Sequence, residues 1–383
     1  MNIIFDARVI QDHFPGIGRY AYNLLKHLPD HLRENDSITA LIDSRARSVN
    51  LDVHALQHER ITFVDHRVRF FDPRNLLPPT GVSDTKDSLY HFTYYVRPHL
   101  VRRPTVTTLY DAISHVYPNL TPSPRTRIII HLLTTLATSA SSAILTISQS
   151  AARDIAHYYP AARGKITVTP LAPDERFTPV DQAQQALVRT KYNLPTHFTL
   201  YLASNKPHKN LVRLVEAWGM VKRDRRPEVS DDLQSPPHLV IAGHQDPRYN
   251  EAQVRVQELG LTDQVRFIGD TPNSDLPALY SACRLFVFPS LYEGFGLPPL
   301  EAMACGAPVA CSNTSSLPEV VGDAALLFNP LIPAEIAAMC QRVLQNSDLE
   351  SNMRQSSLKQ AAKFTWHQCA GTTVDVYRSV KNR

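Results

Sequence analysis

Several features that define whole classes of protein are scarce or missing in this sequence of 383 residues. It holds only five cysteines, an odd number, and their spacing fits no metal-binding motif. A disulfide framework and a zinc site are therefore not expected, and the cysteines fit the reduced thiols of a cytosolic protein. An Asp-x-Asp metal-binding motif is also missing.

The chain has no strong excess of charge of one sign. Its 40 lysines and arginines face 36 aspartates and glutamates, which gives a net charge of +4, and the positive charges are spread over both halves. We therefore expect no nucleic-acid partner. The strand-like residues 2–5 follow Met1 directly, without a basic leader and an apolar core, so we expect no signal peptide and a cytoplasmic location.

One long stretch without a formal charge, residues 128–147, has the length of a membrane span. His131 and seven serines and threonines make it too polar for that role, and no aromatic belt flanks it. We interpret it as a buried helix that ends near Ala140, followed by a strand at 143–147.

The most informative stretch is a strand, a loop and a helix within residues 285–309. The apolar run Leu285–Phe288 predicts a buried parallel strand, and Pro298 or Pro299 suits the first helical position. The loop at 294–297 then lies at the carboxyl end of a strand, where open α/β sheets bind ligands. Its glycines let the backbone approach a ligand closely, and the helix start favours an anion.

Two glutamates frame this loop, Glu293 before it and Glu301 on the helix, with seven residues between them. Carboxylates accept hydrogen bonds from sugar or ribose hydroxyls but repel a phosphate. We therefore assign them to hydroxyls and assign a phosphate to the loop amides. The alternative is that Glu301 complements the helix dipole while Glu293 is a solvated loop residue.

Residues 293–309 read Glu-Gly-Phe-Gly-Leu-Pro-Pro-Leu-Glu-Ala-Met-Ala-Cys-Gly-Ala-Pro-Val. This pattern resembles the nucleotide-sugar site of retaining glycosyltransferases of family 4, above all bacterial mannosyltransferase-type members. The resemblance extends over nearly the whole chain. It implies the α/β fold called GT-B, in which two Rossmann-like domains face each other across a deep cleft and a C-terminal helix crosses back to the first domain.

The apolar pattern begins at Ile3 and starts again at Phe198, which indicates two successive α/β units. We expect an acceptor-side domain at 1–178, a nucleotide-sugar domain at 179–362 and a returning helix at 363–383. Residues 166–177 resemble the family's linker. The polar, proline-rich residues 223–237 predict an exposed, mobile loop.

A glycine-containing loop, Gly16-Ile17-Gly18-Arg19-Tyr20, follows the first strand. It resembles the family loop that faces the cleft, and Arg19 would meet a phosphate or an acceptor anion. The same glycines also match the dinucleotide fingerprint, with Asp43 as the ribose-binding acid. That alternative predicts an NAD-dependent dehydrogenase, although about eight residues separate the first glycine from the strand.

Two further segments resemble family motifs. Tyr110-Asp111 stands after the strand at 105–109, where the family commonly has His-Asp, so Asp111 matches and Tyr110 does not. Pro207-His208-Lys209-Asn210 resembles the segment whose lysine binds the diphosphate. A lysine at a helix start is unfavourable unless an anion is bound, which supports that role for Lys209.

The resemblance implies a metal-independent glycosyltransferase without a cofactor. It would move a sugar, with retention, from a nucleoside diphosphate sugar such as GDP-mannose to a hydroxyl of a glycan or lipid-linked acceptor. The base, sugar and acceptor stay open, and the alternatives are the dehydrogenase and a non-catalytic nucleotide-sugar-binding protein. The expected catalytic residues are Asp111, Lys209 and Glu293. The expected donor-binding residues are Gly16, Gly18, Arg19, Tyr110, Ser204, Lys206, Ile268, Gly294, Phe295, Gly296, Leu297 and Glu301.

Basic and aromatic residues mix at 67–71, and Leu100-Val101-Arg102-Arg103 adds further positive charge later in the chain. Such clusters would suit a peripheral contact with an anionic membrane, here the inner face of the cytoplasmic membrane. A solvated rim is the alternative interpretation of the same residues.

Overall fold

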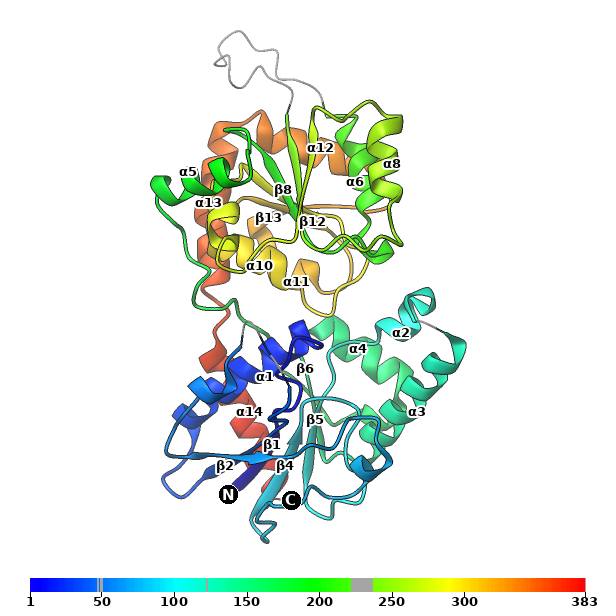
Figure 1. Cartoon of the computed structure of the whole chain (residues 1–383), viewed down its shortest axis with the longest axis vertical. Coiled ribbons are helices and arrows are strands. Elements are labelled where there is room, and N and C mark those ends of the chain that lie inside the picture. Colours follow the sequence, from blue (N-terminus) through cyan, green and yellow to red (C-terminus); the bar gives the residue numbers. More distant parts are fainter. Residues whose placement is uncertain (47, 49–50, 122, 222–236, 383) are drawn as a thin grey trace. The chain divides into compact units, whose positions relative to one another are not determined.

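The computed structural model describes residues 1–46, 48, 51–121, 123–221 and 237–382, and these form two compact units (Figure 1). Unit 1 comprises Met1–Leu171 and Thr365–Arg383, and unit 2 comprises Ala172–Phe364. The loop predicted at 223–237 lies, apart from residue 237, outside the described residues. The chain passes between the units after Leu171 and after Phe364, whereas the sequence analysis expected boundaries after residues 178 and 362.

Unit 1 is built on a seven-stranded sheet whose paired strands are all parallel. The strand order is β3-β2-β1-β4-β5-β6-β7, so it reverses between β1 and β4. The central strands β4, β5 and β6 are buried along their whole length, as expected for a parallel sheet with helices on both faces. The strands are β1 (Asn2–Asp6), β2 (Ser37–Ile42), β3 (Ile61–Asp65), β4 (Ser88–Phe92), β5 (Thr105–Thr108), β6 (Ala143–Thr146) and β7 (Ile166–Val168).

The helices of unit 1 begin at residues that favour helix starts. Ser123 and Ser148 each accept a backbone N–H bond as N-cap residues of α3 and α4. The α-helices are α1 (Pro15–His27), α2 (Ile113–Val116), α3 (Pro124–Ala140), α4 (Gln149–Tyr158) and α14 (Trp366–Lys381). The 3-10 helices are η1 (Leu28–His31), η2 (Val53–Ala55), η3 (Pro73–Leu76), η4 (Pro118–Leu120) and η5 (Pro160–Ala162).

Unit 2 repeats the same architecture with a six-stranded parallel sheet. Its order is β10-β9-β8-β11-β12-β13, so the reversal falls between β8 and β11. Ligands of open α/β sheets bind at the carboxyl ends of the strands beside such a reversal. The strands are β8 (Thr199–Leu202), β9 (Leu239–Ala242), β10 (Val265–Gly269), β11 (Leu285–Phe288), β12 (Val309–Ser312) and β13 (Ala325–Phe328).

Helices cover the sheet of unit 2, with α6, α8 and α12 grouped on one side and α10 and α13 on the other (Figure 1). The buried Trp218 of α6 belongs to the core between the first group and the sheet. The helices are α5 (Gln182–Lys191), η6 (Pro207–Lys209), α6 (Leu211–Trp218), α8 (Glu251–Glu258), α9 (Leu276–Ala282), α10 (Leu297–Ala304), α11 (Leu317–Val321), η7 (Gly322–Ala324), α12 (Pro333–Leu344) and α13 (Ser347–Ala361).

The predicted fold class is confirmed, since two parallel α/β units form and the last helix, α14, packs in unit 1. Two details were wrong. The loop predicted at 16–20 is helical, because α1 begins at Pro15 and both glycines lie in its first turn. Residues 166–168 are the edge strand β7, not linker.

Helix α14 is held to unit 1 by a buried histidine as well as by packing against α1 and η1. His91 on β4 is fully buried, with its Nδ1 2.6 Å from the Tyr377 hydroxyl of α14 and its Nε2 2.8 Å from the Thr108 hydroxyl. Burial lowers the pKa of His91 to about 3. The ring is therefore neutral in the folded chain, with one nitrogen donating and the other accepting.

We expect His91 to make the folded chain sensitive to acid. The unfolded chain binds a proton at the ordinary histidine pKa near 6.5, but folded His91 does not until about pH 3. Its contribution is complete above pH 6.5 and is lost as the pH falls toward 3. At pH 5 the loss is about 2 kcal/mol of unfolding free energy. Denaturant unfolding of wild type and His91→Gln at pH 5 and 8 measures it.

The His91→Gln variant should be less stable at pH 8, yet it should lose less stability than wild type on acidification. His157→Gln, which alters an exposed histidine of α4, is the matched control and should keep the wild-type pH dependence. Equal pH dependence in wild type and His91→Gln would show that another group causes the acid sensitivity.

Candidate functional site

The strand-order reversal of unit 2 carries an ion pair between two predicted site residues. Lys209 ends η6 in the connection after β8, and Glu293 lies in the loop after β11. Lys209 Nζ is 2.6 Å from Glu293 Oε1, and the two side chains are only 16% and 14% exposed. Lys209 Nζ also lies 5.4 Å from the centre of the Phe288 ring. The structure thus brings together the residue predicted to bind the diphosphate, Lys209, and the residue predicted to bind the sugar, Glu293.

Lys209 is positioned by its neighbour Asn210, a buried residue in the left-handed conformation with φ 60° and ψ 34°. Asparagine is among the few residues that adopt this conformation readily. Its side-chain amide donates to the carbonyl oxygens of Pro289 and Pro330 at 3.1 and 2.7 Å. The amide of Leu291 also donates to the carbonyl of His208 at 2.7 Å. These bonds fix the lysine turn onto the loop after β11.

Glu293 is positioned by two serines from the connection between β12 and α11. Ser315 has a positive φ of 51°, and its hydroxyl accepts the backbone N–H of Glu293 at 3.0 Å. The Ser316 hydroxyl lies 2.9 Å from the carbonyl oxygen of Glu293 and 2.6 Å from that of Phe295. The sequence interpretation missed both serines and Asn210. The run of small polar residues at 312–316 signalled only a loop.

The glycine loop turns sharply into α10 at Gly296, which has φ 115°. A Cβ atom there would lie 2.7 Å from Cδ2 of Leu317. Pro298 and Pro299 follow at the second and third helical positions and carry no N–H. The first turn of α10 therefore offers an anion one backbone N–H group, that of Leu297, which is fewer than the sequence predicted. Further N–H donors to an anion would have to come from the loop before the helix.

We expect Gly296→Ala to damage this loop. The substitution forces a strained φ and a clash with Leu317, each of which costs about 1–3 kcal/mol unless the loop moves. Affinity for the expected nucleotide-sugar donor should fall together with stability, because the backbone amides predicted to bind its phosphate belong to this loop. Gly260→Ala is the matched control, since Gly260 has φ 63° but open space around its Cβ position. Calorimetric donor titration that finds both variants equal would contradict this role.

The other residues predicted in unit 2 differ in accessibility. Glu301 is buried on α10, with its Oε2 3.4 Å from the Tyr280 hydroxyl of α9. Ser204 follows β8, where its carbonyl oxygen accepts the Tyr201 hydroxyl at 3.0 Å. Lys206 is exposed at the start of η6, and Ile268 is half-buried on β10, which β9 separates from β8.

His208 adds a buried histidine beside the ion pair that the sequence interpretation did not single out. Its Nδ1 has no hydrogen-bond partner among the described residues. Burial, together with the charge of Lys209, lowers the pKa of His208 to about 4. The imidazole is therefore neutral near pH 7 and adds no charge to the turn that carries Lys206 and Lys209.

The residues predicted in unit 1 gather near the carboxyl ends of β1 and β5. The Tyr110 hydroxyl donates to the carbonyl oxygen of Thr93 at 2.9 Å, and its ring packs edge-on against Tyr20 at 5.3 Å. Burial raises the pKa of Tyr110 well above 10, so the phenol stays protonated. Asp111 Oδ1 accepts the backbone N–H of Ile113 at 2.9 Å. Tyr110 is thus a packed, hydrogen-bonded residue in this unit.

Gly16 and Gly18 lie in the first turn of α1, and Arg19 follows directly after it. Gly18 is required by packing, because a Cβ atom there would lie 2.8 Å from the carbonyl oxygen of Val9. The turn that includes these glycines therefore packs on the chain after β1. Gly16 is exposed, with open space around its Cβ position, and Arg19 is half-buried.

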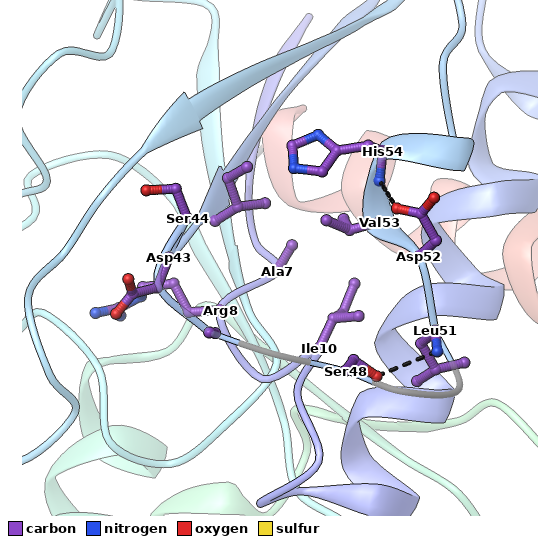
Figure 2. Close-up of a pocket in the computed structure, with 12 residues that line it drawn as sticks. Ala7, Arg8, Ile10, Asp43, Ser44, Ser48, Leu51, Asp52, Val53 and His54 are labelled. Atoms are coloured by element: carbon purple, nitrogen blue, oxygen red, sulfur yellow. Dashed lines mark hydrogen bonds between the residues drawn. The ribbon is translucent and has the colours of Figure 1, made fainter.

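A pocket of about 390 Å³ lies at the carboxyl ends of β1 and β2 in unit 1. Figure 2 shows Arg8 and Asp43 on one side of it and Asp52 and His54 on the other. The dinucleotide interpretation places a ribose on Asp43. Both carboxylate oxygens of Asp43 instead accept bonds from the guanidinium of Arg45, at 2.9 and 2.8 Å. The geometry therefore does not favour a dinucleotide at this edge.

In the described part of the chain, no group of three histidine, cysteine, aspartate or glutamate side chains is arranged to hold a metal ion. Within the same residues, no helix has the length and apolarity needed to cross a membrane. All five cysteines are free and buried, and burial raises the pKa of Cys283, Cys340 and Cys369 to about 12.

The structure is that of a two-unit α/β protein with an ion pair at the strand-order reversal of unit 2, and comparison with known proteins identifies its family. The family model "Glycosyl transferases group 1" matches residues 186–360. The "O-antigen chain mannosyltransferase B" of Escherichia coli is 33% identical over 99% of this chain and 100% of that protein. The chain belongs to the group 1 glycosyltransferases, and it is a glycosyltransferase enzyme.

Two further comparisons agree with this family. The "Serotype-specific mannosyltransferase WbdA" of Escherichia coli is 36% identical over 61% of this chain and 28% of that longer protein. Among solved structures, the Anabaena protein Alr3699/HepE in complex with UDP-glucose has a TM-score of 0.74 and 18% identity, with 99% of this chain and all of that chain covered. The family resemblance and the fold class are confirmed, and the dehydrogenase and non-catalytic alternatives are wrong.

Proposed function

We propose that this glycosyltransferase moves a sugar, with retention and without a metal, from a nucleoside diphosphate sugar to a hydroxyl of a glycan or lipid-linked acceptor. GDP-mannose is the favoured donor, because the relatives with 33% and 36% identity are named as mannosyltransferases. The observation that carries the proposal is the ion pair between Lys209 and Glu293 at the strand-order reversal of unit 2. The complex of HepE with UDP-glucose supports a nucleotide sugar in this fold.

The ion pair prepares both residues for the donor. Glu293 neutralises Lys209 at 2.6 Å, which avoids an unpaired charge in a half-buried position. A bound donor would bring its diphosphate to Lys209 and a sugar hydroxyl to Glu293, so each residue exchanges one partner for another. Glu301 would accept a ribose hydroxyl, and Ser204, Lys206, Ile268 and the loop at 294–297 would surround the nucleotide.

Catalysis would rest on charge stabilisation. Breaking the bond between the anomeric carbon and the diphosphate leaves positive charge on the sugar and adds negative charge to the phosphate. Lys209 and the loop amides would stabilise that developing negative charge in a fixed position. The acceptor oxygen would attack the anomeric carbon on the face from which the diphosphate leaves, and its proton would pass to a phosphate oxygen. The products are the glycoside and a nucleoside diphosphate.

Unit 1 would hold the acceptor. Arg19 and Asp111, with Gly16 and Gly18 shaping the chain near Arg19, are the proposed contacts of this unit with the acceptor and the reacting sugar. Tyr110, whose hydroxyl donates to Thr93, would fix the backbone before Asp111. The pocket of about 390 Å³ beside β1 and β2 has a volume suited to a small ligand and offers this unit further space for a glycan.

A thermal-shift panel of GDP, UDP, ADP and dTDP sugars tests the donor assignment. A ligand at about 100 times its dissociation constant stabilises the folded state by about 2.7 kcal/mol, which is measurable. We expect GDP-mannose to raise the melting temperature most. A larger shift with a UDP, ADP or dTDP sugar would show that the donor carries that nucleotide and not GDP. No shift with any of these nucleotide sugars would overturn the proposed donor site.

We expect EDTA to leave transfer activity unchanged. The sequence has no Asp-x-Asp motif, and the described residues offer no cluster of metal ligands. Lys209 and the backbone amides would take the electrostatic role that a metal has in other enzymes. Initial rates of sugar transfer with and without EDTA measure the effect. A complete loss of activity that magnesium or manganese restores would contradict the metal-independent mechanism.

A further inference from the structure

Helix α3 carries its large apolar side chains on the outside of unit 1. Ile128, Ile129, Leu132 and Leu136 are 44–65% exposed, whereas the buried residues of the helix are the smaller Thr134, Ala137 and Thr138. Spacings of three and four residues place the exposed four on one side of a helix. The helix predicted at 128–140 therefore exists, but the expectation that it is buried was wrong.

We name the four exposed side chains of Ile128, Ile129, Leu132 and Leu136 the α3 row. Within unit 1, α3 contacts α2, η5 and β5, and Figure 1 shows it at the outer edge of that unit. These contacts leave the α3 row uncovered. Contiguous exposed apolar side chains on one helix face mark a surface that contacts another molecule or a membrane.

The charged residues of α3 itself have one sign. Between Asp111 and Asp154 the sequence has no aspartate or glutamate, and the arginines there are Arg125, Arg127 and Arg153. Arg125 precedes Ile128 by three residues and Leu132 by seven, so it lies on the same side of the helix. An apolar strip with basic residues and no acidic ones complements an anionic lipid surface.

The basic clusters at 67–71 and 100–103 differ from this helix in their charge balance. The chain at the start of the second cluster lies beside Leu76, because the backbone N–H groups of His99 and Leu100 both donate to the carbonyl oxygen of Leu76. Three arginines in or beside these clusters are neutralised by an aspartate at 2.7–2.9 Å. These pairs are Arg67 with Asp65, Arg74 with Asp72, and Arg103 with Asp84.

We propose that the α3 row docks this enzyme on an anionic lipid bilayer, with α3 lying in the plane of the interface. The apolar side chains would enter the boundary between headgroups and acyl chains, and Arg125 and Arg127 would meet the lipid phosphates. In-plane binding fits α3, because its large apolar side chains are exposed along one side of the helix while Thr134, Ala137 and Thr138 are buried. The inference concerns unit 1 alone and does not depend on which donor unit 2 binds.

Vesicle co-sedimentation of the full chain tests the proposal. We expect binding to vesicles of equal parts phosphatidylglycerol and phosphatidylcholine, and much weaker binding to phosphatidylcholine alone or at high salt. The double substitution Ile128→Gln/Leu132→Gln should weaken binding to the mixed vesicles about tenfold or more. The double substitution Arg125→Gln/Arg127→Gln should remove most of the preference for the anionic lipid.

The matched control is Leu187→Gln/Leu331→Gln, which removes two exposed leucines of unit 2 and should leave vesicle binding unchanged. All variants alter exposed or half-exposed side chains, and circular dichroism melting checks that each is folded. Wild type that does not bind anionic vesicles, or an Ile128→Gln/Leu132→Gln variant that binds like wild type, overturns the proposal. Light scattering that finds a wild-type dimer and a monomeric variant would instead assign the α3 row to contacts between two copies.

Discussion

Replacement of Lys209 by alanine is expected to lower kcat/KM for sugar transfer by about 10²–10³-fold, the usual effect of removing one preorganised stabiliser of transition-state charge. The reason is the position of its ammonium group at the strand-order reversal, where the diphosphate would develop charge. The substitution also leaves Glu293 without its ion-pair partner in a half-buried position. The resulting loss of unfolding free energy, about 1–3 kcal/mol, still leaves a fold of ordinary stability intact.

The matched control for this prediction is Lys191→Ala. Lys191 also makes an ion pair of 2.6 Å within unit 2, with Asp275, but it lies on α5, away from the strand-order reversal. Its loss should change the melting temperature slightly and the rate hardly at all. Steady-state rates and melting temperatures of both variants separate the two roles. A Lys209→Ala variant whose activity falls only in proportion to its folded fraction would mean that Lys209 is structural.

The two glutamates should respond differently to conversion into glutamine, which keeps the size and removes the charge that strengthens a hydrogen bond. Glu301→Gln would weaken the proposed ribose contact, which should be equal in ground and transition states, so it should raise the donor KM with little change in kcat. The expected loss is about 1.5–3 kcal/mol, or about 10- to 100-fold in kcat/KM. Glu293→Gln should lower kcat itself, because charge develops on the sugar that Glu293 would contact.

Steady-state kinetics with donor varied at saturating acceptor decide between these outcomes. Glu258→Gln, which changes an exposed glutamate of α8, serves as the control and should behave like wild type. Our assignment is inverted if Glu301→Gln lowers kcat while Glu293→Gln raises only the donor KM. If both variants resemble the control, the site of transfer lies elsewhere, and the helix-dipole interpretation of Glu301 is correct.

The sequence was most informative where one local pattern determines the structure. Short apolar runs such as Leu285–Phe288 predicted strands well, because a buried parallel strand needs continuous apolar residues. The proline pair after Gly296 marked the start of α10 correctly. The strand β3 was missed, because Ile61–Asp65 lies at the sheet edge, where alternating exposure weakens the apolar signal.

The contacts that shape the site could not be predicted, because they join residues far apart in the chain. Asn210 is polar and follows a lysine, which indicates a loop, yet its buried amide bonds to Pro289 and Pro330. Ser315 and Ser316 hold the backbone of Glu293 from another connection. The prediction that helix α3 is buried was wrong for another reason. An apolar helix suggests burial when its neighbours are unknown, but the large side chains of α3 are exposed.

The most direct test of the proposed transfer reaction is the anomeric configuration of its product. Purified protein would be incubated with GDP-α-mannose, EDTA and a short mannoside acceptor with a hydrophobic aglycone, and the new linkage would be read by the one-bond carbon–proton coupling at the anomeric carbon. We predict an α-linked product and release of GDP, since the acceptor would attack on the face that the diphosphate leaves. A β-linked product, or transfer that appears only when a divalent metal replaces EDTA, would contradict the account.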